Sequence, residues 1–190
     1  MLTELTKKYR LIREAVAEKG SSDPVEVVQS VMRQEFISMH GPEHHFLDGA
    51  AFLVAYKNSG GQIDLGSCFN ELEKRAASMP GAMCGYWGIC GSVASVGAAM
   101  SIIRETGPLS TDRYYKEHME YASRVLETMS RIGGARCCKR NAFLALSIAA
   151  KFMRERYEMP MESGKINCNF SSRNAQCLGI RCPFYSQSAE

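Results

Sequence analysis

Residues 136–158 read RCCKRNAFLALSIAAKFMRERYE, and their apolar side chains recur at intervals of three and four. This interval is typical of one face of an α-helix rather than of a strand. The apolar positions are Phe143, Leu144, Leu146, Ile148, Ala149, Phe152 and Met153. Gly133 and Gly134 precede the segment and Pro160 follows it, so chain breakers bound it on both sides. The sequence therefore predicts one long amphipathic helix here.

Six further helices are predicted before residue 136, because apolar residues repeat there with the same period. The first carries the stripe Leu2, Leu5, Tyr9, Ile12 and Val16 and ends at Gly20. The second helix is expected to start at Pro24, the third to span about 42–57, and the fourth to follow a cap at Asp64. The fifth is expected to span about 92–105, and the sixth to follow a cap at Ser110 or Thr111. The last of these carries the stripe Tyr115, Met119, Ala122, Leu126 and Met129. No long run alternates with period two, so the predicted fold class is all-α, a bundle of about seven helices.

The composition fits a globular protein of one main domain. The chain has 190 residues, of which 45% are apolar and 23% charged, with a net charge of +3. Such a chain buries a core without disulfides, and global disorder is excluded. The small charge and the lack of a basic stripe argue against a nucleic-acid partner. Residues 1–160 are predicted to form a helical domain, and residues 161–190 an irregular Cys-rich tail packed on it.

The compartment bears on how the eight cysteines are interpreted. The first residues are charged and amphipathic and show no secretory signal, so a cytoplasmic location is expected. Residues 76–103 carry no charge and are long enough to span a bilayer, but Pro80 and several glycines and serines interrupt them. We therefore expect a loop and a buried helix there, and no membrane partner. Without secretion, the cysteines are expected to be thiols, metal ligands or catalytic groups.

Three of the four histidines lie in the segment HGPEHHFLD at residues 40–48. Pro42 suits the first turn of a helix, so His44 and His45 are expected to project about 100° apart. Asp48 lies one turn after His44 and is expected to orient it. Neutral imidazoles serve as metal ligands and as acid–base groups, whereas capping and packing are the structural alternative. The candidates are His40 and His44 as metal ligands, and His44 and His45 as catalytic residues.

A glycine-rich segment, PGAMCGYWGICG at residues 80–91, contains Cys84, Cys90 and the only tryptophan, Trp87. Glycines allow a bound group to approach the backbone closely. The segment leads into the start of a predicted helix, where backbone amides favour anions and thiolates. Cys84 and Cys90 are therefore candidate metal ligands, and Trp87 a candidate ligand contact. The alternative is a packing loop with two buried, inert thiols.

The segment GGARCCKRN at residues 133–141 places Cys137 and Cys138 in the first turn of the long helix. The helix dipole and the neighbouring cations are both expected to lower a thiol pKa from its reference value of about 8.5. Cys137 and Cys138 are thus candidate nucleophiles and candidate metal ligands. The cations Arg136, Lys139 and Arg140 are candidate contacts for an anionic ligand.

Three more cysteines, Cys168, Cys177 and Cys182, lie in the tail, which lacks a helical stripe. An irregular segment needs something to order it, and a metal supplies that order. These residues are candidate ligands, with a fourth expected from Cys84, Cys90, Cys137, Cys138 or a histidine. Packing of the tail on the helices without a metal is the alternative.

Three predicted helices begin at the histidine, glycine-rich and Cys137–Cys138 segments, and alternate helices of an up-down bundle start at the same end. A single Cys/His site at one end is therefore plausible on geometric grounds. Cys68 and His118 lie on predicted helix faces and are expected to be structural.

Taken together, the four segments resemble a Cys/His-rich domain of unknown function found in anaerobic bacteria and methanogenic archaea. The resemblance covers about residues 25–185. Members of that family are found alone or attached to S-adenosylmethionine-dependent enzymes, which the resemblance therefore implies as a candidate partner.

Three functions remain open from the sequence. The first is a metal- or iron–sulfur-binding protein of anaerobic metabolism with a redox or group-transfer role, because thiolates are soft ligands suited to iron–sulfur clusters or zinc. The second is a metal-independent thiol enzyme with a Cys nucleophile and a His base. The third is an accessory module that binds a small anionic ligand.

Overall fold

The computed structural model describes residues 3–186, and within them the fold is entirely helical. The α-helices are α1 Glu4–Ala17, α2 Pro24–Met32, α3 His44–Asn58, α4 Leu65–Ala77, α5 Met83–Tyr86, α6 Gly91–Ile103, α7 Arg113–Ile132 and α8 Cys138–Tyr157. Two 3₁₀ turns follow, η1 Ser171–Arg173 and η2 Gly179–Arg181. The predicted all-α bundle of about seven helices is confirmed; only the four-residue α5 has no predicted counterpart. Leu2 of the predicted first stripe and residues 187–190 of the predicted tail lie outside the described residues.

Aspartate side chains fix the starts of three helices. The caps predicted at Asp23 and Asp64 are observed, with carboxylates that accept backbone N–H groups from the first turns of α2 and α4. The cap of α7, predicted at Ser110 or Thr111, is instead Asp112, whose carboxylate accepts a first-turn N–H at 2.9 Å. The Ser110 hydroxyl accepts from the backbone of the preceding loop instead.

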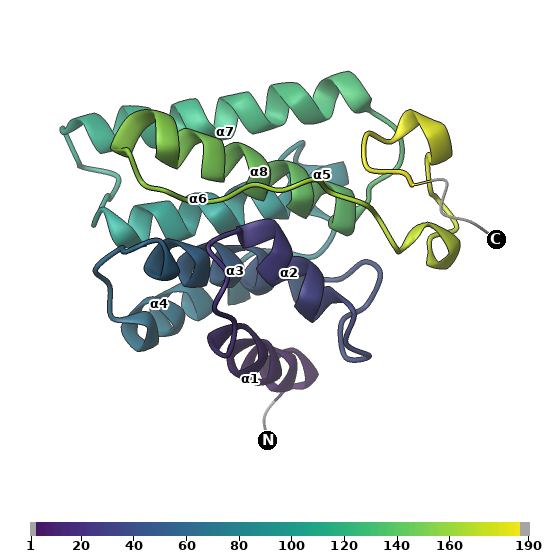
Figure 1. Cartoon of the computed structure of the whole chain (residues 1–190), viewed down its shortest axis with the longest axis horizontal. Coiled ribbons are helices and arrows are strands. Elements are labelled where there is room, and N and C mark those ends of the chain that lie inside the picture. Colours follow the sequence, from purple (N-terminus) through teal and green to yellow (C-terminus); the bar gives the residue numbers. More distant parts are fainter. Residues whose placement is uncertain (1–2, 187–190) are drawn as a thin grey trace.

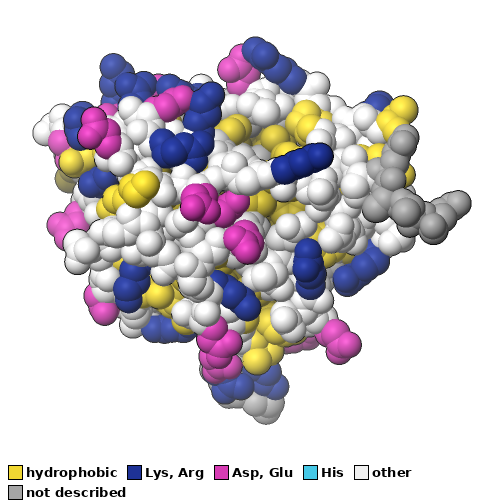
Figure 2. Space-filling model, viewed as in Figure 1, with side chains coloured by type: hydrophobic (Ala, Val, Ile, Leu, Met, Phe, Trp, Pro, Cys, Tyr) yellow, Lys and Arg dark blue, Asp and Glu magenta, His cyan; other side chains and the backbone are white. Residues whose placement is uncertain are grey.

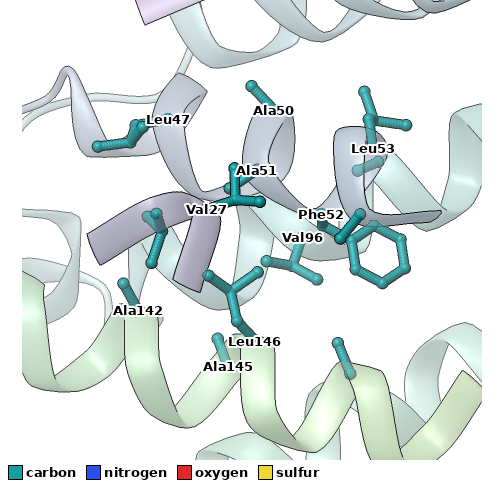
Figure 3. Packing of buried hydrophobic residues seen from close by; sticks show 14 of the residues in the cluster. Val27, Leu47, Ala50, Ala51, Phe52, Leu53, Val96, Ala142, Ala145 and Leu146 are labelled. Carbon is teal, nitrogen blue, oxygen red and sulfur yellow. The ribbon is translucent and has the colours of Figure 1, made fainter. Parts of the chain in front are cut away.

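Helix α3 is the centre of the bundle and is buried on nearly every side. It packs against α1, α2, α4, α6 and α8. In Figure 1, α7 lies along the top of the bundle and α1 at the bottom, with α3 between them. Figure 3 shows Ala142, Ala145 and Leu146 of α8 near Val27 of α2 and the side chains of α3. Small side chains on α8 therefore let three helices meet in one core.

Helices α3 and α6 approach each other closely at Gly49. The Gly49 backbone N–H donates to the Ser95 hydroxyl at 2.8 Å. A Cβ atom at position 49 would lie only 2.7 Å from the Ser95 carbonyl oxygen. Because that oxygen belongs to the α6 backbone, the two helices need a glycine at this crossing.

The buried face of α7 differs from the predicted stripe by about one residue. Tyr115 and Met119, predicted to be inside, are 41% and 53% exposed, whereas Tyr121 and Val125 are fully buried. Helix α7 packs on α6 and α8, and the Tyr121 hydroxyl donates to a backbone carbonyl of α8. The face that enters this groove also carries His118, for which Gly97 of α6 leaves space. The predicted stripe is confirmed for Ala122, Leu126 and Met129, which are partly buried against the core. It is wrong for Tyr115 and Met119, because the buried face is centred on Tyr121 and Val125 instead.

The stripe of α1 packs inside the molecule. Tyr9, Ile12 and Val16 are buried and belong to the same core as α3. No helix in the described part of the chain is both long and apolar enough to cross a bilayer. Figure 2 shows Lys, Arg, Asp and Glu side chains interspersed over one face of the molecule, without a field of a single sign.

After α8 the chain runs back across the bundle to its opposite end (Figure 1). Near α2, the Gly164 backbone N–H donates to the Asp23 carboxylate at 2.7 Å. Further on, the rings of Phe170 and Phe184 pack against Phe143 of α8, with centroid separations of 6.5 and 5.6 Å. A single β-bridge joins Cys168 to Tyr185. The described part of the tail is therefore docked on the helices by a few specific contacts.

Candidate functional site

A cavity of about 270 Å³ lies where α3, α6 and α8 begin. We call it the imidazole cavity. Its walls include His40, His44, His45, Cys84, Cys90, Cys138, Arg136, Ser92 and Asn141. These residues come from the histidine segment, the glycine-rich loop and the start of α8. The structure thus brings together side chains from three segments that are far apart in the sequence.

Glycines shape this cavity by letting side chains pass close to the backbone. A Cβ atom on Gly91, the first residue of α6, would lie 2.2 Å from the His45 ring. His45 therefore occupies the space that a side chain at position 91 would fill. Gly41 plays the same part for Glu43, since a Cβ there would lie 2.0 Å from the Glu43 carboxylate.

His44 connects the cavity to a buried charge network. Its Nδ1 lies 3.6 Å from the Asp48 carboxylate, so Asp48 is close to His44 as predicted, but the two groups form no hydrogen bond within the described chain. Its Nε2 lies 3.2 Å from Nζ of Lys139, which also donates to the Ser38 carbonyl at 2.9 Å. Asp48, His44 and Lys139 are each at most 1% exposed. Burial lowers the pKa of Lys139 to about 8, although the negative charge of Asp48 opposes this shift.

The thiols of the helix start are less acidic than the sequence suggests. Burial raises the pKa of Cys138 to about 12, despite a nearby Gly41 backbone amide that favours the thiolate. Burial also raises the pKa of Cys137 and of Cys90. The expectation of a lowered pKa at Cys137 and Cys138 fails, because desolvation outweighs the helix dipole and the adjacent cations. Cys138 lines the cavity together with His44 and His45, and its burial favours the neutral thiol over the nucleophilic thiolate.

A second, narrow cavity of about 20 Å³ lies on the other side of the α8 start. We call it the cysteine pocket, because Cys137, Cys168, Cys177 and Cys182 all line it. Its remaining walls are largely apolar and include Phe143 and Phe170. The tail cysteines and one cysteine of the helix start therefore come together although they are distant in sequence.

Two sulfur atoms in the cysteine pocket accept hydrogen bonds from nitrogen donors. The Cys137 sulfur accepts from the Arg140 backbone at 3.5 Å and from the Asn174 side-chain amide at 3.6 Å. The Cys177 sulfur accepts from the Gly179 backbone at 3.4 Å. Donors of this kind stabilise a thiolate more than a thiol.

The candidate metal ligands thus fall into two groups. His40, His44, Cys84, Cys90 and Cys138 line the imidazole cavity, and the four cysteines named above line the cysteine pocket. The consecutive residues Cys137 and Cys138 point to different cavities. All eight cysteines are free thiols. Among residues 3–186, no three side chains of His, Cys, Asp or Glu are arranged to hold one metal ion.

The candidate ligand contacts are not all in the cavity. Arg136 lines it, but Lys139 is buried behind it, and the Arg140 guanidinium bonds to the Ala135 carbonyl and to Asn141. Trp87 is 63% exposed and lines neither cavity. Trp87 is the C-cap residue that directly follows the short α5.

Two asparagines that no sequence pattern singles out are part of these sites. The Asn141 side-chain amide donates to the Cys90 sulfur at 3.2 Å. The Asn174 side chain contacts Nε2 of His40 at 3.2 Å as well as the Cys137 sulfur. Their partners lie 37 to 134 residues away in the chain, so no local pattern signals these contacts.

Glu43, next to these histidines, gives a prediction for the pH dependence of stability. Burial alone would raise its pKa, but its own and the Ser38 backbone amides, the Ser38 hydroxyl and the Lys8 ammonium hold the pKa near 2. Because the pKa of Glu43 is lower in the folded chain than its ordinary value of 4.5, its ionised carboxylate stabilises the fold at pH values above 4.5. This stabilisation is lost as the pH falls towards the folded-state pKa of about 2. Glu43→Gln is therefore expected to lower the free energy of unfolding by about 2 kcal/mol at pH 7.

Urea denaturation of wild type and Glu43→Gln at several pH values checks this expectation. The difference between the two chains should shrink steadily below pH 4.5. Glu14→Gln, at an exposed position with a long ion pair to Arg10, should match wild type throughout. A Glu43→Gln effect that does not change with pH would contradict the assignment.

The fold and these cavities define a helical protein with thiols and imidazoles gathered at the start of α8. The chain belongs to a family of unknown function, DUF5714, which matches residues 12–185. The match spans all four Cys/His-rich segments. No curated protein and no solved structure matches the chain.

Proposed function

We propose that the chain is an iron–sulfur protein with a redox role, and that Cys137, Cys168, Cys177 and Cys182 hold its cluster. The observation that carries this proposal is the convergence of four cysteines from two separate parts of the chain on one narrow pocket. Four thiolates are the usual ligand set of [2Fe–2S] and [4Fe–4S] clusters. Bound there, such a cluster supplies one-electron chemistry.

The lack of a ready-made single-ion site in the described chain leads us to propose a cluster rather than a single ion. A tetrahedral zinc ion with Zn–S bonds of about 2.3 Å brings its sulfurs to about 3.8 Å from one another. No three possible ligands of the described chain are arranged to hold one ion in this way. A cluster is wider than an ion and holds its cysteines farther apart. Its entry would require the pocket to widen beyond about 20 Å³.

The tail is suited to that widening. Its segment from Cys168 to Cys182 contains only two short 3₁₀ turns, and one bridge pairs it with the residues that follow. The backbone hydrogen bonds of the three tail cysteines are all made within the tail itself, so the tail can move outward without breaking them. Cluster binding would then order a segment that has little regular structure of its own.

Hydrogen bonds to two of the sulfurs would favour thiolate ligands, although burial raises the pKa of Cys137 and of Cys168. The N–H groups of Arg140, Asn174 and Gly179 point at two of the four sulfurs. Hydrogen bonds to cluster sulfurs and a low exposure to solvent are two of the factors that set a cluster's reduction potential. The resemblance to domains attached to S-adenosylmethionine-dependent enzymes makes such an enzyme the redox partner that we propose.

Purification without oxygen, with analysis of iron, sulfide and zinc, tests the proposal. We expect iron and acid-labile sulfide in equal amounts, and a broad visible absorbance that a reductant bleaches. Cys177→Ser should lose most of the iron. Cys84→Ser, which changes a cysteine of the imidazole cavity, should retain it.

Two results would contradict the proposal. A colourless chain with one zinc ion would replace the cluster by a zinc–thiolate site. An equal loss of iron in Cys84→Ser and Cys177→Ser would show that the cluster is not confined to the cysteine pocket.

A further inference from the structure

The imidazole cavity carries positive potential from its backbone. The first residues of α3, α6 and α8 all line it, and these helices have 15, 13 and 20 residues. Each helix start carries about half a positive elementary charge. None of the three helices has an acidic residue in its first turn. Three helix starts therefore act together on one cavity.

Arg136 adds a full positive charge at the wall of the cavity. It is exposed, and no carboxylate of the described chain forms an ion pair with it. Two acidic side chains, Glu43 and Asp48, lie near the start of α3. Glu43 forms an ion pair with Lys8 at 3.1 Å, and Asp48 is fully buried with its carboxylate 3.6 Å from Nδ1 of His44.

A buried polar group in the wall lacks a partner. His45 lines the cavity and is only 7% exposed, yet its Nδ1 has no hydrogen-bond partner within residues 3–186. The Nδ1 of His40, another wall residue, is also buried and has no partner in the described part of the chain. Leaving a buried polar atom unpaired costs about 1–3 kcal/mol, so such atoms point to a missing ligand or water.

We propose that the imidazole cavity binds a small metabolite through a doubly charged oxyanion of the phosphate type. Arg136 and the three helix starts supply the charge, and His40, His45 and Ser92 supply hydrogen bonds. Arg136 and the three helix starts together carry more than two positive charges. A phosphate group, with two negative charges, matches them better than a carboxylate with one. The volume of about 270 Å³ suits a small phosphorylated molecule rather than a nucleotide-sized ligand.

This inference does not rest on the iron–sulfur proposal, because its residues line a different cavity. The two can fail separately. Cys177→Ser, which removes one of the proposed cluster ligands, should still bind phosphate saturably and more tightly than acetate.

Calorimetric titration with inorganic phosphate tests the inference, with acetate as a second probe and sodium chloride at matched ionic strength as a control. Phosphate should bind saturably and more tightly than acetate. Arg136→Gln should weaken phosphate binding about tenfold or more, because it removes a charge-assisted contact. Arg33→Gln, which changes an exposed arginine that does not line the cavity, should bind as wild type.

A second variant targets the shape of the cavity. Gly91→Ala forces the His45 ring to move, and it should abolish phosphate binding while circular dichroism still reports a helical fold. Equal affinities in Arg136→Gln and Arg33→Gln would overturn the proposal. So would acetate binding as tight as phosphate, or the absence of saturable binding.

Discussion

Phe143→Ala is expected to lower the free energy of unfolding by about 4 kcal/mol, a large share of the stability of a domain of this size. Phe143 is fully buried in α8, and its ring packs against both Phe170 and Phe184 of the tail. The substitution leaves a cavity in the core and removes the surface on which the tail docks. Both the global stability and the attachment of the tail should therefore suffer.

Two measurements separate these effects. Urea denaturation reports the global loss, and the rate of thiol modification at Cys168, Cys177 and Cys182 reports release of the tail. Phe52→Ala is the matched control, because Phe52 is equally buried but stacks on Tyr56 within α3. It should cost similar stability without the same rise in thiol reactivity under native conditions. Equal reactivity in both variants would show that Phe143 does not anchor the tail.

Gly49→Ala is expected to destabilise the fold by about 3 kcal/mol, although alanine favours helices over glycine. The new Cβ would meet the Ser95 carbonyl oxygen at 2.7 Å and the Leu72 side chain at 3.0 Å. The carbonyl belongs to the backbone of α6, so it cannot turn away as a side chain can. The helices α3 and α6 would have to separate at the centre of the core.

Gly66→Ala provides the control on another helix. A Cβ at Gly66 would find its nearest neighbour at 3.6 Å, an ordinary contact. This change should leave stability unaltered or raise it by up to about 1 kcal/mol. Thermal unfolding of both variants measures the contrast. Similar stabilities for the two would mean that α3 and α6 are not in such close contact.

The helices were predictable where local chemistry determines them. Helix α8 has its own apolar period and chain breakers, and Asp23 and Asp64 are caps that act within one turn. The face of α7 was not predictable in the same way. Its burial depends on Gly97, in a different helix, which leaves room for the His118 ring. The positions of the apolar residues along α7 do not reveal the partner residue in α6.

The sequence predicted which residues line the candidate sites better than it predicted how they are arranged. The density of Cys, His and Gly singled out the segments that line both cavities. Which cavity each cysteine joins depends on how the tail docks, through aromatic contacts such as that of Phe143 with Phe184. The pKa of Cys138 depends in the same way on burial by distant segments. For Trp87, composition suggested a ligand contact, but the side chain is exposed and lines neither cavity.

The consecutive residues Cys137 and Cys138 have a thermodynamic consequence. They lie in one turn but face different cavities. If ligand binding in one cavity shifts that turn, the shift also changes the shape of the other cavity. The Asn174 amide, between His40 and Cys137, forms a second connection. Any free energy of coupling between the two cavities would then be reciprocal. If phosphate binding changed the affinity for the proposed cluster by some factor, cluster binding would change the affinity for phosphate by the same factor.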